Sequence, residues 1–199
     1  MQAFKPSDEV DFSRRYTLEE FWALPEREDR VRYDLIGGHL FMVPPANPPH
    51  GSLDSRFNVA LVTFITANKI VGEVLHPHEG IYRRAEASTY LEPDMMFVSR
   101  ELKERMGTKR TSADIVFEYL SRSTAKYDRT TKADAYLALG VRELWLVDPV
   151  TVSIEVRHAS THEGLLAWEV CKYSNGEYAK SRVLDGFEVS VDEIFTGLT

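Results

Sequence analysis

The chain has 199 residues, 43% of them hydrophobic and 28% charged, a balance that predicts a globular protein with a sizeable core. No apolar run approaches the roughly 20 residues of a membrane-spanning helix. The single cysteine excludes an internal disulfide framework. Because MQAFKPSDEVDFSRR also lacks the apolar core of a signal peptide, we expect a cytoplasmic protein. The net charge of −7 argues against nonspecific coating of nucleic acid, but it does not exclude a nuclease with a local basic surface.

The first third of the chain predicts a helix, a hairpin and a longer helix. Thr17 and Glu20 have the spacing of a capping box and predict a short helix over YTLEEFWALPE. The segment VRYDLIGGHLFMV predicts a hairpin with its turn at Gly37 and Gly38, and PPANPP a loop. Apolar residues then recur at helical spacing over residues 52–70, which predicts the longest helix.

Strands dominate the remainder. We expect strands at GEVLH, GIYRR and TYLEPDMMFVS, and then the helix SRELKERM, which Ser99 caps. The next strand is DIVFEYL, followed by a helix over DRTTKADAYLALG that ends at Gly140 and by the buried strand VRELWLVD. The C-terminal segments are strand-like, with a turn at Asn175 and Gly176 and a final helical turn at VDEIF. This pattern predicts an α/β protein with a mixed central sheet flanked by helices, with an N-terminal arm over 1–16 and a single domain over 17–199.

Glu118 is an unusual residue for its strand. Alternation over residues 114–120 sets it on the same face as Val116 and Leu120, among apolar side chains. An ionised carboxylate in such surroundings costs several kcal/mol unless something pairs with it. We therefore expect a basic partner, a proton or a metal ion beside Glu118.

Asp94 has the same character as Glu118. It alternates in register with Met96 and Val98, so it also points to an apolar face. If the two strands are adjacent, the two carboxylates would raise each other's pKa or require a cation between them. Mg²⁺ typically takes one or two carboxylates plus water and substrate phosphate, so the pair is a candidate metal site.

Lys132 is the candidate third member of this site. It lies four residues after Asp128 and four before Tyr136, on one face of the predicted helix that follows Glu118. Plainer interpretations remain open: Glu118 and Lys132 form a structural ion pair, or Asp94 bonds backbone amides at a strand end. Tyr136 is expected to pack, and Asp148 to terminate its strand.

The chain resembles the Uma-type putative restriction endonucleases, a family long catalogued as a domain of unknown function in the PD-(D/E)XK nuclease superfamily. The resemblance covers residues 17–195 and rests on five ordered motifs: YDLIGGHL, PPH, LEPDMMFVS, DIVFEYLSRST and YDRTTKADAYLALGVRELWLVDP. It implies a restriction-endonuclease-like fold.

The resemblance also implies roles for the site residues. Asp94 and Glu118 match the two acids that bind metal, with Mg²⁺ as the expected ion and Mn²⁺ as a substitute. In the superfamily pattern a lysine follows the second acid by two positions, but this chain has Leu120 there, and the lysine has moved into the next helix as Lys132.

Two further residues are implied as auxiliary members of the site. Asp34 stands where the family usually has glutamate, and it is expected to complete the site or to help hold a second ion. His50 matches a histidine that opens the long helix, and it is expected to contact phosphate or to position Asp34. Asp34 can equally serve the turn near Gly37, and His50 can be a helix-cap or surface histidine. His76 and His78 are expected to belong to a loop.

The expected activity is metal-assisted hydrolysis of phosphodiester bonds, with DNA as substrate. The competing hypothesis is a noncatalytic nuclease-fold module that binds nucleic acid or a protein partner, and a hydrolase of small phosphate compounds would share the same metal site. Cleavage of both strands of a duplex favours a homodimer. Two basic clusters, around Lys103 to Arg110 and around Arg122 to Lys132, are interpreted as solvated faces rather than binding patches.

Overall fold

The computed structural model describes residues 10–25, 31–77, 79–85 and 88–198. His78, which was expected to belong to a loop, and most of the predicted N-terminal arm lie outside the described residues. The chain folds into two compact units, a smaller one formed by Met1–Pro45 and Arg83–Leu91 and a larger one formed by Ala46–Tyr82 and Glu92–Thr199. No helix among the described residues is long and apolar enough to cross a membrane.

The smaller unit contains the predicted N-terminal helix and hairpin. Helix α1 (Leu18–Trp22) has the predicted capping box: the Thr17 hydroxyl accepts the N–H of Glu20, and the Glu20 carboxylate accepts the N–H of Thr17. Strands β1 (Arg32–Ile36), β2 (His39–Val43) and β5 (Thr89–Leu91) belong to a four-stranded sheet that β4 (Ile81–Arg83) completes, in the order β2-β1-β5-β4. The β1–β2 and β1–β5 pairs are antiparallel. Gly37 and Gly38 both have positive φ, 59° and 83°, as a tight hairpin turn requires.

The larger unit is built on a six-stranded sheet with the order β10-β9-β8-β7-β6-β3. The strands are β3 (Gly72–Leu75), β6 (Met95–Ser99), β7 (Ile115–Tyr119), β8 (Glu143–Asp148), β9 (Ser153–His162) and β10 (Leu165–Tyr173). The β7–β8 pair is parallel and the other pairs are antiparallel, so the sheet is mixed. Strand β4 (Ile81–Arg83) carries the chain from this unit into the smaller one.

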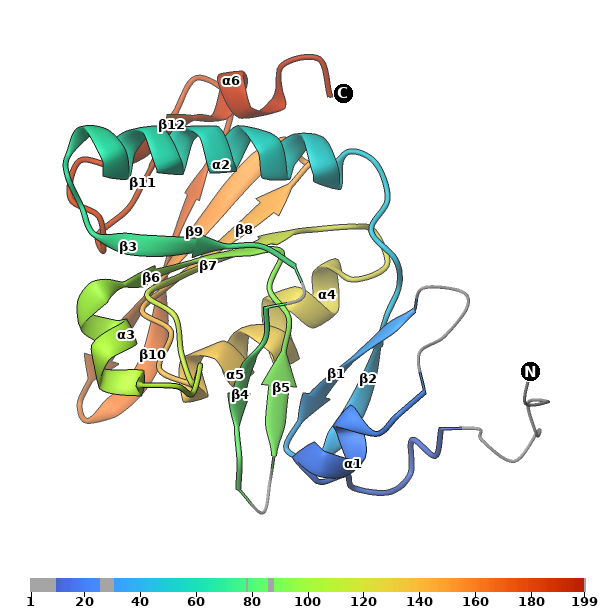
Figure 1. The fold of residues 1–199 in the computed structure, drawn as a ribbon. Coiled ribbons are helices and arrows are strands. Elements are labelled where there is room, and N and C mark those ends of the chain that lie inside the picture. The colour runs from blue at the N-terminus through green and yellow to red at the C-terminus, as the bar shows by residue number, and fades with distance from the viewer. Residues whose placement is uncertain (1–9, 26–30, 78, 86–87, 199) are drawn as a thin grey trace, which may run out of the picture. The chain divides into compact units, whose positions relative to one another are not determined.

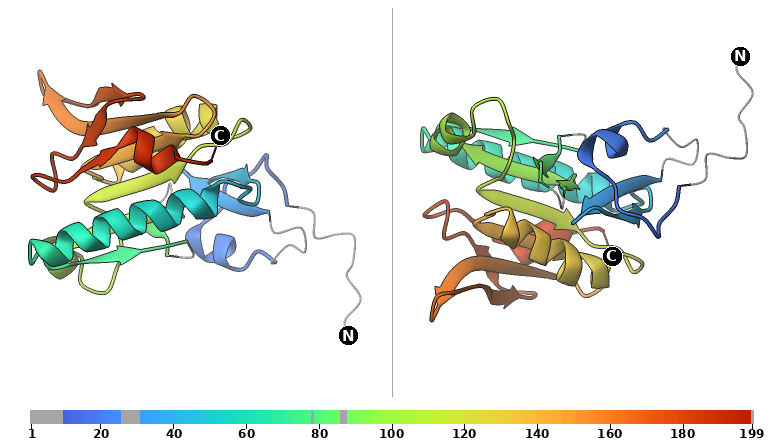
Figure 2. Two further views of the ribbon diagram at one scale, coloured as in Figure 1. Left: turned by 90° about the horizontal axis from the view of Figure 1, so that it is seen from above. Right: turned by 90° about the horizontal axis from the view of Figure 1, so that it is seen from below.

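The two faces of this sheet are covered by different helices, as Figures 1 and 2 show. Helix α2 (His50–Ala67) lies over the apolar face, where the ring centroid of Phe57 is 5.3 Å from Phe117 and 6.1 Å from Trp145. The opposite face carries Glu118 and is covered by a single helical segment. That segment consists of α4 (Ala125–Tyr127), the π-helical turn η1 (Asp128–Lys132) and α5 (Ala133–Ala138). Strand alternation thus separates an apolar core from the face that carries charged residues.

Shorter elements complete the larger unit. These are α3 (Arg100–Met106), the hairpin of β11 (Tyr178–Lys180) and β12 (Glu188–Ser190), and α6 (Val191–Phe195). The hydroxyl of Ser99 accepts the N–H of Leu102 and caps α3, as predicted. The predicted fold class, a mixed α/β sheet flanked by helices, is confirmed.

One local prediction was wrong. The segment TYLEPDMMFVS was expected to be one strand, but it forms β5 and β6, which belong to different sheets. The break falls at Glu92-Pro93-Asp94, where Pro93 has no N–H to donate to a strand ladder. The helix predicted over DRTTKADAYLALG is present, and the first five residues of that segment, Asp128–Lys132, form a π-helical turn.

Candidate active site

Glu118 and Asp94 face each other across two neighbouring strands. The β6–β7 pairing sets Met95 opposite Phe117 and Met96 opposite Val116, and the same register continued by one residue sets Asp94 opposite Glu118. Directly opposed residues of an antiparallel pair point to the same face of the sheet. The two carboxylates that the sequence singled out therefore share one face, although 24 positions separate them in the chain.

Asp94 is held by the backbone of β7. It immediately precedes β6 and is half-buried, and its Oδ2 accepts the N–H of Tyr119 at 2.7 Å. The interpretation of Asp94 as an acceptor for backbone amides at a strand end is therefore correct in geometry. This hydrogen bond from a backbone amide fixes the orientation of the Asp94 carboxylate next to Glu118.

Glu118 is buried, with 4% of its surface exposed, and it is surrounded by hydrogen-bond donors. The Lys132 ammonium lies 2.8 Å from both carboxylate oxygens of Glu118. This ion pair is one of the interpretations that the sequence left open. The hydroxyl of Tyr136, one helical turn further on, donates to Oε1 at 2.5 Å. The ammonium of Lys132 also lies 3.5 Å from the carbonyl oxygen of Glu92. Lys132 thus connects Glu118 to the segment that precedes Asp94.

The charge around Glu118 is unbalanced. Burial raises its pKa well above the usual value for a glutamate; the positive charge of Lys132 opposes this effect, whereas the negative charges of Asp94 and Asp128 add to it. Among the described side chains that act on this pKa most strongly, the carboxylates of Asp94 and Asp128 raise it and the ammonium of Lys132 lowers it. Such an excess of negative charge favours either a bound proton or an additional cation.

Sequence analysis missed the role of Tyr136, which was expected only to pack. It is fully buried and is the second donor to Glu118. The signal was present, because its spacing of four residues from Lys132 puts both side chains on one side of the helix. Asp128, four residues before Lys132, is likewise buried on that side.

Asp34 and His50 occupy different units. Asp34 is buried in β1 of the smaller unit, opposite Phe41 of β2. His50 is the first residue of α2 in the larger unit; its Nδ1 lies 2.7 Å from the carbonyl oxygen of Asn47, and its ring packs edge-on against Tyr119. His50 therefore contacts the residue that follows Glu118 in β7, and its role and that of Asp34 remain predictions.

A sequence profile decides the family. The profile of the Uma2 putative restriction endonucleases matches residues 18–192, nearly the whole chain. The chain belongs to the Uma2 family. No curated protein matches the sequence. A solved structure, a putative nuclease of the family DUF820 from Anabaena variabilis ATCC 29413, matches 92% of this chain and 99% of its own with a TM-score of 0.71 and 18% identity. At that identity the likeness concerns the fold.

The carboxylate pair of this Uma2 protein fits a divalent cation. Glu118 accepts from Lys132 at both oxygens and from Tyr136 at Oε1, which leaves a lone pair on Oε2. No described residue donates to Oδ1 of Asp94. A hard cation could bind Oδ1 of Asp94 and the remaining lone pair on Oε2 of Glu118, and it would complete its coordination with water and phosphate. Within the described part of the chain, no group of three or more His, Cys, Asp or Glu side chains is arranged to hold a metal ion.

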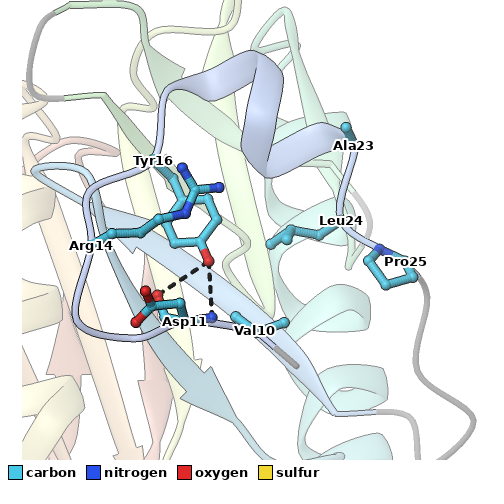
Figure 3. Close-up of a pocket in the computed structure, with 7 residues that line it drawn as sticks. All are labelled: Val10, Asp11, Arg14, Tyr16, Ala23, Leu24 and Pro25. Atoms are coloured by element: carbon cyan, nitrogen blue, oxygen red, sulfur yellow. Dashed lines mark hydrogen bonds between the residues drawn. The ribbon is translucent and has the colours of Figure 1, made fainter. Parts of the chain in front are cut away.

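The smaller unit contains a pocket of about 440 Å³ (Figure 3). It contains none of the predicted site residues and is lined by Val10, Asp11, Arg14, Tyr16, Ala23, Leu24 and Pro25. The Arg14 guanidinium stacks over the Tyr16 ring, 3.8 Å from its centroid, and also pairs with Glu20. The polar groups of this pocket are thus engaged with one another.

Proposed function

We propose that this Uma2 protein is a Mg²⁺-dependent nuclease that hydrolyses phosphodiester bonds in DNA. The observation that carries the proposal is the opposed pair Asp94 and Glu118, with Lys132 bonded to Glu118 on the same face of the sheet. Membership of a family described as putative restriction endonucleases supports a nuclease-like activity and a nucleic acid substrate. The metal, the DNA substrate and the residue roles are part of the proposal.

Each site residue has a distinct task in this proposal. Asp94 and Glu118 would hold the cation, and Mn²⁺ would be able to replace Mg²⁺. When bound, the cation supplies Lewis-acid polarisation of a phosphoryl oxygen and a water of lowered pKa. The N–H of Tyr119 keeps Asp94 oriented, while Tyr136 keeps Glu118 oriented. Lys132 provides a fixed positive charge where negative charge develops in the transition state.

Asp34 and His50 enter the proposal as auxiliary residues. Asp34 would supply a further carboxylate, and His50 would contact the phosphate. Replacing each by alanine should lower cleavage less than replacing Asp94 does, because neither is one of the two proposed metal ligands.

A homodimer is also part of the proposal, since two-fold symmetry suits cleavage of both strands of a duplex. Sedimentation velocity with and without a short duplex tests this point. A species of twice the monomer mass supports the dimer, and a monomer under both conditions contradicts it.

The decisive experiment combines metal binding and DNA cleavage. Mg²⁺ and Mn²⁺ are titrated calorimetrically into three proteins, with and without a DNA duplex: wild type, Asp94→Asn and the control Glu169→Gln. The same proteins are then assayed for nicking of supercoiled plasmid. Asp94→Asn preserves the size of the side chain and an acceptor for Tyr119, whereas Glu169 pairs with Arg182 on the surface. We expect Asp94→Asn to lose binding and cleavage and Glu169→Gln to retain both. Absence of metal binding in wild type, even with DNA, would refute the proposal.

The noncatalytic module remains the competing function, and the charges of the surface bear on it. Several members of the two basic clusters are paired with acids. Lys103 pairs with Glu73 and Arg110 with Glu79 in the first cluster, and Arg129 pairs with Asp148 and Lys132 with Glu118 in the second. If wild type binds DNA without cleaving it in either metal, and Glu118→Gln binds equally well, the module is the better description.

A further inference from the structure

The π-helical turn that carries Lys132 receives hydrogen bonds from side chains of the neighbouring sheet. A π turn is rare, because its wider i→i+5 hydrogen bonding disrupts the regular pairing of the helix, and such turns occur frequently at functional sites. Carbonyl groups that lose their helical partner need another donor when they are buried. The source of those donors is therefore informative.

Three backbone carbonyls in and next to η1 accept hydrogen bonds from side chains. The Thr130 hydroxyl donates to the carbonyl of Lys126 at 2.7 Å, within the helix itself. The guanidinium of Arg157, on β9, donates to the carbonyl of Arg129 at 2.8 Å. The indole N–H of Trp168, on β10, donates to the carbonyl of Ala133 at 3.1 Å. Two of the three donors thus come from the sheet.

Arg157 is fixed in place by a chain of ion pairs that returns to the same turn. Glu155 accepts Arg157 through Nε and Nη2, at 2.6 and 2.5 Å. Glu155 also pairs with Arg129 at 3.4 Å, and Arg129 pairs with Asp148 at 2.9 Å. Arg157, Glu155 and Asp148 have side chains 12%, 11% and 8% exposed, respectively. Two cations and two anions compensate each other, so the network can be retained in partly buried surroundings.

The strand register puts this network on the face of the sheet that carries Glu118. Glu118 is opposite Leu146 on β8, and Leu146 is opposite Glu155 on β9. The helical segment is therefore anchored at two places on one face: Lys132 binds Glu118, and three residues earlier Arg129 binds the network. A turn that reverted to regular α-helix would rotate Arg129 relative to Lys132, so both anchors could not be kept.

We infer that Arg157, acting with Glu155, Arg129 and Asp148, is a positioning residue that maintains the π turn and thereby sets Lys132 against Glu118. The positioning follows from the contacts alone, and only its consequence for catalysis rests on the proposed function. Trp168 supports the far end of the same turn.

The test compares Arg157→Met, which removes the charge and all side-chain donors, with Arg157→Lys, which retains the charge and one donor nitrogen. Arg182→Met is the matched control, because Arg182 also pairs with a glutamate but on an exposed surface. Two readouts are local: hydrogen exchange of the amides of residues 128–133, and the ¹⁵N resonance of the Lys132 ammonium, which is visible while its hydrogen bond to Glu118 protects it from water. Amides of β7 report global stability.

For Arg157→Met we expect the amides of the π turn to exchange faster by at least about tenfold, because tenfold corresponds to the free energy of about one hydrogen bond to a charged group. The ¹⁵N signal of the Lys132 ammonium should be lost, and the amides of β7 should be less affected. Arg157→Lys should restore part of both, and Arg182→Met should change neither. If Arg157→Met does not fold, Trp168→Phe provides the test, with faster exchange confined to the end of the turn. Unchanged exchange, or equal loss of protection in β7 and the turn, would overturn the inference.

These readouts separate the inference from the proposed function. If wild type neither binds metal nor cleaves DNA, the exchange experiment still tests the positioning. If wild type cleaves DNA, Arg157→Met should lower kcat with little change in KM, since the network does not touch the proposed ligands. A change in KM alone would count against the role in positioning Lys132.

Discussion

Replacing Lys132 by methionine should destabilise the protein strongly and in a pH-dependent way. The change removes the cation from a pair in which Lys132 is 3% and Glu118 4% exposed. Breaking a buried pair by removing one partner costs about 3–5 kcal/mol. Against a total of about 5–15 kcal/mol for a domain, this is a large fraction of the free energy of unfolding.

The pH dependence follows from the remaining carboxylate. Burial, Asp94 and Asp128 already raise the pKa of Glu118, and Lys132 is the group that opposes them. Without Lys132 the pKa of Glu118 should rise further, so the folded variant binds a proton that the unfolded chain releases. A raised pKa in the folded state gives stability that is present at low pH and is lost as pH increases. The destabilisation should therefore be larger at pH 8 than at pH 5.

The assay is urea denaturation followed by tryptophan fluorescence at both pH values. The double variant Lys132→Met with Glu118→Gln should recover much of the loss, because no buried charge is left unpaired. Arg182→Met, which breaks a pair whose side chains are 53% and 44% exposed, should cost no more than about 1 kcal/mol. A loss below about 1 kcal/mol for Lys132→Met, or an equal loss at both pH values, would refute the reasoning.

Four other predictions concern stability. Phe57→Ala should lower the free energy of unfolding by about 3–5 kcal/mol, measured in urea, because Phe57 is fully buried; a loss near zero would mean that the core closes over the gap. Ser99→Ala should cost about 0.5–2 kcal/mol by removing the cap of α3, whereas Ser99→Thr should keep most of it. Gly72→Ala should cost about 1–3 kcal/mol, because its Cβ would meet the Phe97 ring at 2.5 Å, and a neutral thermal melt would contradict this. Burial raises the pKa of Glu143, but hydrogen bonds, chiefly from His158 and Trp145, outweigh this effect and lower the pKa below its usual value. The stability that Glu143 contributes should therefore be lost as pH falls. Glu143→Gln should flatten the acid side of a curve of unfolding free energy against pH.

Local sequence patterns accounted for most secondary structure. The capping box at Thr17, the glycine pair at the first hairpin and the serine cap of α3 were correctly predicted, because each depends on residues within one turn of the chain. The same kind of pattern identified Glu118 as a carboxylate among apolar neighbours and set Lys132 on a helix that follows it. These are consequences of the periods of strand and helix.

Tertiary structure decided the relations between these segments. That Asp94 lies opposite Glu118 depends on the register between β6 and β7, which packing of the whole sheet selects. The single predicted strand through Pro93 became two because its halves join different sheets.

The π turn is the clearest case of a feature that the sequence by itself did not determine. The hydrogen bonds that the carbonyls of Arg129 and Ala133 accept come from Arg157 and Trp168, side chains 28 and 35 positions away in the chain. No pattern within the helix indicates donors that arrive from another element. The sequence determined which residues carry charge in an apolar setting, and the fold decided which of them meet, because contacts between distant segments depend on the packing of all the elements together.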